Sequence, residues 1–263
     1  MELSGELHVV GTGLRIEGQV TQESLSAIRS ADKLFHLIQD VLTHRWLAEI
    51  NPTAESLFDA YAVGRPRRES YAEMTERILA PVRRGLHVCA AFYGHPGVFV
   101  MPAHAAIRRA REEGYYAEML PGISGEDCLF ADLGIDPGIG GCQSFAATDF
   151  LIRRRRFDPS SHLLLWQVGS IGVTDFRDEV LWNRPGLGVL ARTLAETYGA
   201  GHEVVVYEAD PYPTGDFESH ACALAELEQA PVTLASILYV PPLPERASDP
   251  AMRAALGMPT VAG

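Results

Sequence analysis

Features that would direct a protein to a membrane, to nucleic acid or to secretion are missing from this sequence of 263 residues. Its start lacks the basic region and apolar core of a signal peptide, and no apolar run is long enough to cross a bilayer. Basic residues are few, because 22 Lys and Arg stand against 34 Asp and Glu, giving a net charge of −12. Nucleic acid and anionic membranes both reward positive charge. We therefore expect a cytoplasmic protein that binds neither of them.

Cysteine is also scarce, which bears on metal binding and on disulfides. The four cysteines are Cys89, Cys128, Cys142 and Cys222, and none belongs to a CxxC pair. This pattern predicts free thiols in a reducing compartment and argues against a zinc site or a disulfide framework. We expect no bound metal.

The first half of the chain alternates between strand-like apolar runs and helical periodicity. Strands are predicted at residues 7–10, 33–37, 87–93 and 118–120, and helices at 24–30, 67–84, 103–113 and 124–133. Alternation of this kind predicts an α/β fold with a mostly parallel sheet and helices on both faces.

The pattern changes at residues 134–141, where Gly and Pro are concentrated as in a linker. Beyond it, strands are predicted at 162–168, 203–207 and 234–240, and helices at 188–197, 223–229 and 251–256. We therefore predict two α/β domains, residues 1–136 and residues 137–263, the second ending in a short tail.

The turn Gly11-Thr12-Gly13 follows the first predicted strand. Small residues at such a turn let a ligand or a neighbouring backbone approach closely. A dinucleotide fingerprint would require a third glycine where Ile16 stands, and no helix clearly opens at the turn. A plain tight turn is the alternative interpretation.

Two further loops follow predicted strands. Tyr93-Gly94-His95-Pro96-Gly97 comes directly after a buried strand, where open α/β sheets bind their ligands. It is either a ligand loop or a well-made turn. In the second loop, Ser124 has Asp127 three residues later, which approximates a capping box. That role does not prevent Ser124 from also touching a ligand.

Arg67 and Tyr71 stand four residues apart on the long predicted helix and therefore share a face. One interpretation is an arginine packed on a tyrosine ring as a cation–π contact. The other is chemical, because a nearby guanidinium favours phenolate over phenol and would make Tyr71 a plausible general base. The run of four arginines at 153–156 is either a solvated loop or a docking surface for an acidic partner.

Four segments together resemble the tetrapyrrole methylase superfamily, and most closely its borosin branch, the peptide backbone α-N-methyltransferases. They are GTGL at residues 11–14, YGHPGVFV at 93–100, PGISGEDCLFADLGIDP at 121–137 and CQSFAATDFL at 142–151. The resemblance extends from about residue 7 to residue 257. Porphyrin and cobalamin methylases usually carry an acidic residue at the position of His95, so His95 favours the borosin branch.

The resemblance implies a two-domain tetrapyrrole-methylase-like fold with S-adenosylmethionine (SAM) in the cleft between the domains, leaving as S-adenosylhomocysteine. Gln167, Ala235 and Ser236 are matched through their strands rather than through a sharp motif. The positions expected to contact SAM are Gly11, Tyr93, His95, Val98, Phe99, Ser124, Gly125, Gln167, Ala235 and Ser236.

The resemblance also assigns the chemistry. Arg67 and Tyr71 match the catalytic Arg and Tyr of an RxxxY pattern, and Tyr61 and Tyr93 match further active-site tyrosines. Phe58 stands where some relatives carry another tyrosine. The implied activity is SAM-dependent methylation of backbone amides in a ribosomally made precursor peptide, with Tyr71 as the base and Arg67 assisting it.

Fused borosins carry their substrate as a C-terminal extension, whereas this sequence stops at Gly263. The expectation is therefore a split borosin that modifies a separate precursor peptide in trans, and the resemblance further implies a homodimer. The enzymatic alternative is a methyltransferase acting on a tetrapyrrole or another small molecule. The non-enzymatic alternative is a module that binds SAM or the precursor without turnover.

Overall fold

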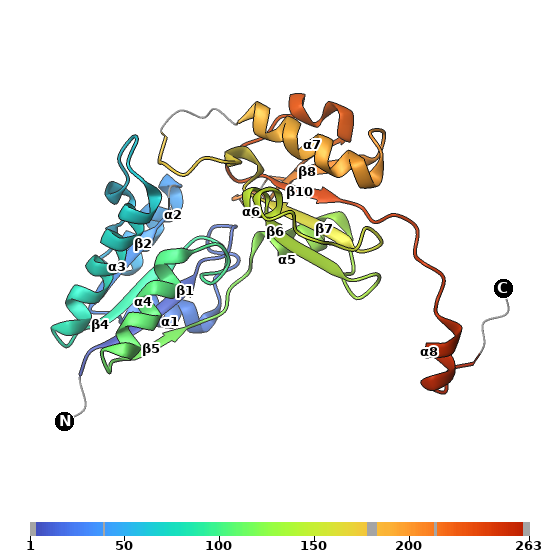
Figure 1. The fold of residues 1–263 in the computed structure, drawn as a ribbon. Helices are drawn as coiled ribbons and strands as arrows, with labels where there is room; N and C mark the ends of the chain where they lie inside the picture. Colours follow the sequence, from blue (N-terminus) through green and yellow to red (C-terminus); the bar gives the residue numbers. More distant parts are fainter. Residues whose placement is uncertain (1–3, 39, 178–182, 213–214, 260–263) are drawn as a thin grey trace.

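Two five-stranded sheets form the core of the protein in the computed structural model (Figure 1), which describes residues 4–38, 40–177, 183–212 and 215–259. The strand order is β3-β2-β4-β1-β5 in the first sheet and β6-β7-β10-β8-β9 in the second. The first half of the chain forms the first sheet, and the second half forms the second sheet.

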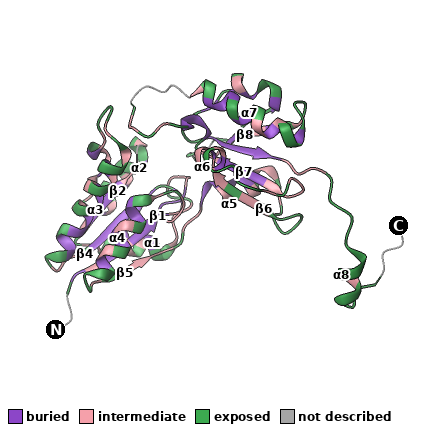
Figure 2. Cartoon of the chain, viewed as in Figure 1, coloured by how far each residue is buried: buried purple, intermediate pink, exposed green. Residues whose placement is uncertain are grey.

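Every strand pair of the first sheet is parallel. Its strands are β1 (Glu6–Gly11), β2 (Lys33–Leu37), β3 (Glu55–Ser56), β4 (His87–Phe92) and β5 (Tyr116–Met119). Helices α3 (Arg67–Arg83) and α4 (Met101–Glu112) pack on one face, and α1 (Gln22–Ser30) and α2 (Val41–Ile50) pack on the other. Because helices cover both faces, β1 and β4 are buried nearly throughout (Figure 2). The predicted parallel sheet is confirmed.

The second sheet is mixed. Its strands are β6 (Cys142–Ala146), β7 (His162–Trp166), β8 (Glu203–Glu208), β9 (Glu218–Ala223) and β10 (Ile237–Val240). Only β6 and β7 pair in parallel. One face packs against α6 (Ala147–Ile152), α7 (Arg184–Tyr198) and the 3₁₀ helix η3 (Leu224–Gln229). The opposite face packs against α5 (Gly125–Leu133).

Helix α5 joins the two halves of the fold. Cys128 and Leu129 of this helix pack with Leu164, Tyr207 and Ile237 of the second sheet. The Tyr207 hydroxyl also donates a 2.6 Å hydrogen bond to the Asp132 carboxylate. The chain therefore crosses to the second sheet before α5, although the division into domains at residue 136 stays a prediction.

Several elements differ from the sequence expectations. Elements α2, β6 and β9 were not predicted from the sequence. Strand β9 is a polar edge strand, exposed at four of its six residues. The helix expected at 223–229 is the 3₁₀ helix η3. The strand expected at 234–240 begins only at Ile237, because Thr233 and Ser236 close a turn in front of it.

The remaining elements are η1 (Phe58–Ala60), η2 (Val168–Ser170) and α8 (Pro250–Ala255), the last at the end of an extended segment (Figure 1). All four cysteines are free. Across the described ranges, no helix combines the length and the apolar character needed to cross a membrane.

His36 is a polar residue buried in the first sheet. It lies on β2, is 0% exposed, and neither ring nitrogen has a hydrogen-bond partner among the described residues. The ring of His44, on α2, lies 4.8 Å away between centroids. Burial, and secondarily the charge of His44, lowers the pKa of His36 from 6.5 to about 4. His36 is therefore neutral in the folded protein near pH 7.

This lowered pKa predicts a pH-dependent stability. Since unfolded His36 takes up a proton below its ordinary pKa of 6.5, the folded state loses stability as the pH falls from 6.5 towards about 4. Between pH 7 and pH 5, wild type should lose about 2 kcal/mol of unfolding free energy through this group. His36→Leu should abolish that part of the pH dependence, as measured by urea unfolding at both pH values.

His44→Leu is the matched control and should keep most of the slope, since burial is the larger cause of the pKa shift. An unchanged slope in His36→Leu would contradict the assignment.

Candidate active site

Three loops meet at the carboxyl ends of β1, β4 and β5. Gly13 and Gly94 exchange backbone hydrogen bonds of 3.3 and 2.8 Å. A Cβ at Gly11 would collide with the Gly94 carbonyl oxygen and lie 2.8 Å from Pro96 Cδ. A Cβ at Gly122 would lie 3.2 Å from the same oxygen. Glycine suits these positions because backbone packs directly on backbone. The Gly11–Gly13 turn thus lets a neighbouring backbone approach closely, which is one of the two interpretations drawn from the sequence.

The β4 loop leaves aromatic surface open at this edge. Tyr93 is 60% exposed, although Phe92 beside it is buried. His95 shapes the loop, since its Nδ1 accepts the Gly97 N–H at 2.9 Å and its carbonyl accepts the Val98 N–H at 3.1 Å. Phe99, with a positive φ of 57°, lies 5.0 Å from the Trp166 ring of the second sheet. The loop is thus both a well-made turn and a bearer of exposed aromatic groups.

Ser124 and Gly125 lie where the chain enters the second half. Ser124 caps α5 in a full capping box with Asp127, which confirms the predicted capping role. A Cβ at Gly125 would lie 3.0 Å from Ile237 and 3.4 Å from Trp166. Gly125 therefore lets the start of α5 approach β7 and β10 closely.

The second-half positions lie on two neighbouring turns. Gln167 follows β7 with a positive φ of 59° and is exposed. Gly169 packs so closely on Thr233 that a Cβ there would collide with its carbonyl oxygen. Ala235 is exposed, whereas the buried Ser236 hydroxyl accepts the Thr233 N–H at 2.8 Å. The Gln167 loop and the Ala235-Ser236 turn are thus brought side by side.

The four predicted catalytic residues form one cluster. Arg67 and Tyr71 lie in the first turns of α3, Tyr61 follows η1, and Tyr93 follows β4. The Tyr61 and Tyr71 rings meet edge to face at 6.2 Å. Burial raises the Tyr61 pKa, and the neighbouring Tyr71 side chain raises it further.

Tyr93 belongs to the same electrostatic group. The density of protein around its hydroxyl, followed by the charge of Tyr71, raises the Tyr93 pKa even though the ring surface is open to solvent. The Arg67 guanidinium opposes the rise at both Tyr61 and Tyr93. Both tyrosines therefore remain protonated hydrogen-bond donors at neutral pH. The only cation–π contact among the described residues is Lys33 over Phe35, so the stacked arginine interpretation of Arg67 and Tyr71 is not supported.

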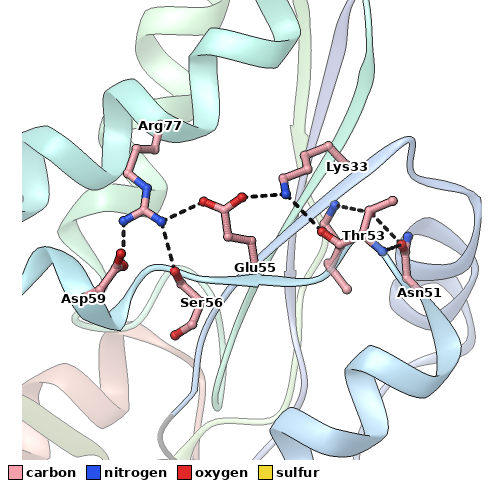
Figure 3. A network of polar contacts seen from close by, with 8 residues as sticks. Lys33, Asn51, Thr53, Glu55, Ser56, Asp59 and Arg77 are labelled. Atoms are coloured by element: carbon pink, nitrogen blue, oxygen red, sulfur yellow. Dashed lines mark hydrogen bonds and ion pairs between the residues drawn. The ribbon is translucent and has the colours of Figure 1, made fainter.

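A polar network fixes the segment that carries Tyr61 (Figure 3). Arg77 of α3 donates to Asp59 of η1 at 2.6 Å, to Glu55 at 2.7 Å and to the Ser56 carbonyl at 3.1 Å. Lys33 of β2 pairs with Glu55 at 2.6 Å. Partial burial disfavours the Glu55 charge, but hydrogen bonds from Lys33 and Arg77 outweigh it and lower the Glu55 pKa. The network therefore stays ionised and ties β2, β3 and η1 to α3.

One aromatic partner of the cluster was missed from the sequence. The Phe176 ring stacks on Tyr61 at 4.8 Å with 17° between the planes, and Phe58 meets both rings edge to face. Phe176 lies more than a hundred residues after Tyr61 in an irregular segment, so no sequence spacing pointed to it. The arginine run lies elsewhere, where Arg153 and Arg155 both pair with Asp149, as a solvated loop would.

The chain is similar to known proteins over most of its length. Residues 6–213 match the family model described as tetrapyrrole (corrin/porphyrin) methylases. A methyltransferase and ribosomally synthesized cyclic peptide gymnopeptides precursor from Gymnopus fusipes is 45% identical over 95% of this chain and 60% of its own length. The corresponding omphalotin A precursor from Omphalotus olearius is 42% identical over 94% and 60%. The chain thus spans about 60% of the length of these curated relatives.

Solved structures show the same fold. A uroporphyrin-III-C-methyltransferase from Thermus thermophilus superposes with a TM-score of 0.63 at 18% identity, covering 91% of this chain and 93% of its own. A cobalt precorrin-4 methyltransferase gives 0.63 at 14% identity, with 90% and 94% covered. The expected tetrapyrrole-methylase-like α/β fold is therefore confirmed.

The packing of the three loops predicts a specific destabilisation. Gly11→Ala should cost about 1–3 kcal/mol of unfolding free energy, because its methyl group would collide with backbone rather than with a side chain that can move. Urea unfolding measures the loss. Gly18→Ala is the control, because its Cβ would meet nothing closer than 3.7 Å. Equal stability of the two variants would refute the close-approach account.

Proposed function

This chain belongs to the tetrapyrrole methylase family, and on that premise we propose that it uses SAM to methylate backbone amide nitrogens of a ribosomally made peptide. The observation that carries the proposal is the cluster of Arg67, Tyr71, Tyr61 and Tyr93, in which the Tyr61 and Tyr71 rings meet edge to face. Support also comes from relatives whose names join a methyltransferase to a cyclic peptide precursor.

The residues at the sheet edge fit SAM chemically. A sulfonium cation is attracted to aromatic faces and to carbonyl oxygens, and this edge offers the exposed Tyr93 ring and the carboxyl ends of β1, β4 and β5. Phe99 and Leu234 are exposed apolar groups that an adenosine could cover. We propose that Gly11, Tyr93, His95, Val98, Phe99, Ser124, Gly125, Gln167, Ala235 and Ser236 hold it.

An amide nitrogen is a poor nucleophile, because its lone pair is delocalised into the carbonyl. Its methylation therefore requires removal of the N–H proton and stabilisation of the charge that grows on the carbonyl oxygen. SAM, when bound, supplies the electrophilic methyl group and leaves as the neutral thioether S-adenosylhomocysteine.

The tyrosines divide these tasks on our proposal. Tyr71 would act as the general base that takes the amide proton as the nitrogen accepts the methyl group. Two groups would assist Tyr71 in this role: Tyr61, whose ring meets it edge to face, and the Arg67 guanidinium. Tyr93, kept protonated, donates to the carbonyl oxygen of the substrate. The released proton ends on Tyr71 and passes to solvent after turnover.

The base assignment predicts a kinetic separation. Tyr71→Phe should lower kcat by about 10²–10⁴-fold, since a positioned general base contributes that much. SAM affinity, measured by calorimetry, should stay near the wild-type value. Tyr116→Phe is the control, an exposed tyrosine on β5 that should leave kcat unchanged. Wild-type turnover in Tyr71→Phe would remove Tyr71 from the mechanism.

The peptide substrate has its own test. We propose that the precursor is supplied in trans to a homodimer, and co-expression with a candidate precursor peptide, followed by intact and fragment mass spectrometry, examines this. Mass steps of one methyl group located on backbone nitrogens are the expected result. Protein that retains SAM, adds no methyl to peptides and methylates a porphyrin or corrin would instead establish the small-molecule activity.

A further inference from the structure

A segment of the second half reaches across to the loop that carries the catalytic tyrosine. Residues 174–176 run antiparallel to residues 64–67, with a bridge between Pro66 and Asp175. The Arg67 N–H donates to the Thr174 carbonyl at 3.1 Å. The Phe176 N–H donates to the Arg65 carbonyl at 3.0 Å, and its own carbonyl accepts the Gly64 N–H at 2.9 Å. We refer to residues 173–176 as the strap.

The strap is anchored at its other end in the second half. The Gly172 N–H just before it donates to the Thr148 hydroxyl of α6 at 2.9 Å. The Val173 N–H donates to the Ser170 carbonyl at 3.0 Å. The position of Phe176 is thus set from both halves of the chain, by the second half through η2 and α6 and by the first through the ladder.

The side chain of Phe176 packs on the Tyr61 ring rather than in a hydrophobic core cluster. It stacks on Tyr61 at 4.8 Å and meets Phe58 edge to face at 5.8 Å. Phe176 belongs to none of the four buried clusters found in the described part of the chain. Tyr61 itself is half-buried, and Phe176 covers one face of its ring.

The opposite side of the Tyr61 loop is held by ionic contacts. The Arg65 guanidinium donates to the Ala60 carbonyl at 2.9 Å and to Glu73 of α3 at 2.6 Å. Together with Arg77 and Asp59, these contacts fix the backbone of the loop but do not hold the Tyr61 ring. The ring meets Phe58 and Tyr71 by its edges, and Phe176 is the one residue stacked on its face among the described ring contacts.

We propose that Phe176 is a positioning residue for methyl transfer, holding the Tyr61 ring in its edge-to-face contact with the Tyr71 ring. This inference rests on the proposed function, because it assigns Tyr61 the task of stabilising the base. It also means that the strap couples the second half of the chain, where part of the SAM site is proposed, to the reacting tyrosines of the first half.

The test replaces the stacking ring and measures peptide methylation. Phe176→Leu should lower kcat on the order of 10²-fold, the scale of a misplaced catalytic contact, with the KM for SAM unchanged. Phe176→Tyr keeps the ring and should rescue kcat to within about twofold, since a tyrosine ring can form the same stack. Phe157→Leu is the matched control, because Phe157 stacks on Tyr198 at 5.9 Å and 11° outside the tyrosine cluster.

A double-mutant cycle separates positioning from general destabilisation. If Phe176 acts through Tyr61, Phe176→Leu should have no further effect on kcat in a Tyr61→Phe background. Losses that multiply in the double variant would overturn the inference. So would a wild-type kcat in Phe176→Leu, or an equal fall in kcat in Phe157→Leu.

A spectroscopic measurement tests the positioning of Tyr61 independently of whether the proposed function is correct. In protein with isotopically labelled tyrosine, the Tyr61 ring signal, identified by its absence in Tyr61→Phe, should shift in Phe176→Leu and stay in place in Phe157→Leu. An unshifted signal would overturn the inference whatever the substrate. Absence of peptide methylation by wild type itself would instead refute the proposed function.

Discussion

The close approach of three backbones at the carboxyl edge of the first sheet is the constraint on which the rest of the site depends. A side chain at Gly11 would fill the space that the Gly94 carbonyl occupies, and one at Gly122 would crowd it at 3.2 Å, so the β4 loop would then have to shift. Because that loop stays close, Tyr93 emerges beside α3 and the segment after η1. Parallel sheets expose their loops at one edge, so a few glycines can set the geometry of the whole site.

Electrostatics then distinguishes tyrosines of identical chemistry. Burial and mutual repulsion of developing charge keep Tyr61 and Tyr93 protonated, while Arg67 works against both effects. Clusters of titratable groups with shifted pKa values are typical of acid and base chemistry in enzymes. The network of Arg77, Glu55 and Lys33 fixes η1 against α3, so that the Tyr61 and Tyr71 rings meet.

The second half of the chain contributes to the site in two ways. Its sheet brings Trp166 against Phe99 and the start of α5 against Ile237, and its strap lays Phe176 on Tyr61. The contacts of Trp166 and Phe176 each place an aromatic ring of the second half against a ring that belongs to the first half. Positioning of this kind can matter more for a reaction than for stability, because small displacements of reacting groups are costly in rate.

The sequence by itself determined the alternating parallel half and the Ser124 capping box, because each depends on local periodicity or on a short motif. The four residues proposed as catalytic came from the resemblance of the sequence to a known family. Tertiary structure alone decided the rest. Phe176 reaches Tyr61 only because an irregular segment pairs with residues 64–67, and α5 joins the second sheet because Cys128 and Leu129 find their apolar partners there. Contacts between segments so distant in the chain leave no periodic trace, since side-chain spacing records only the faces of single elements.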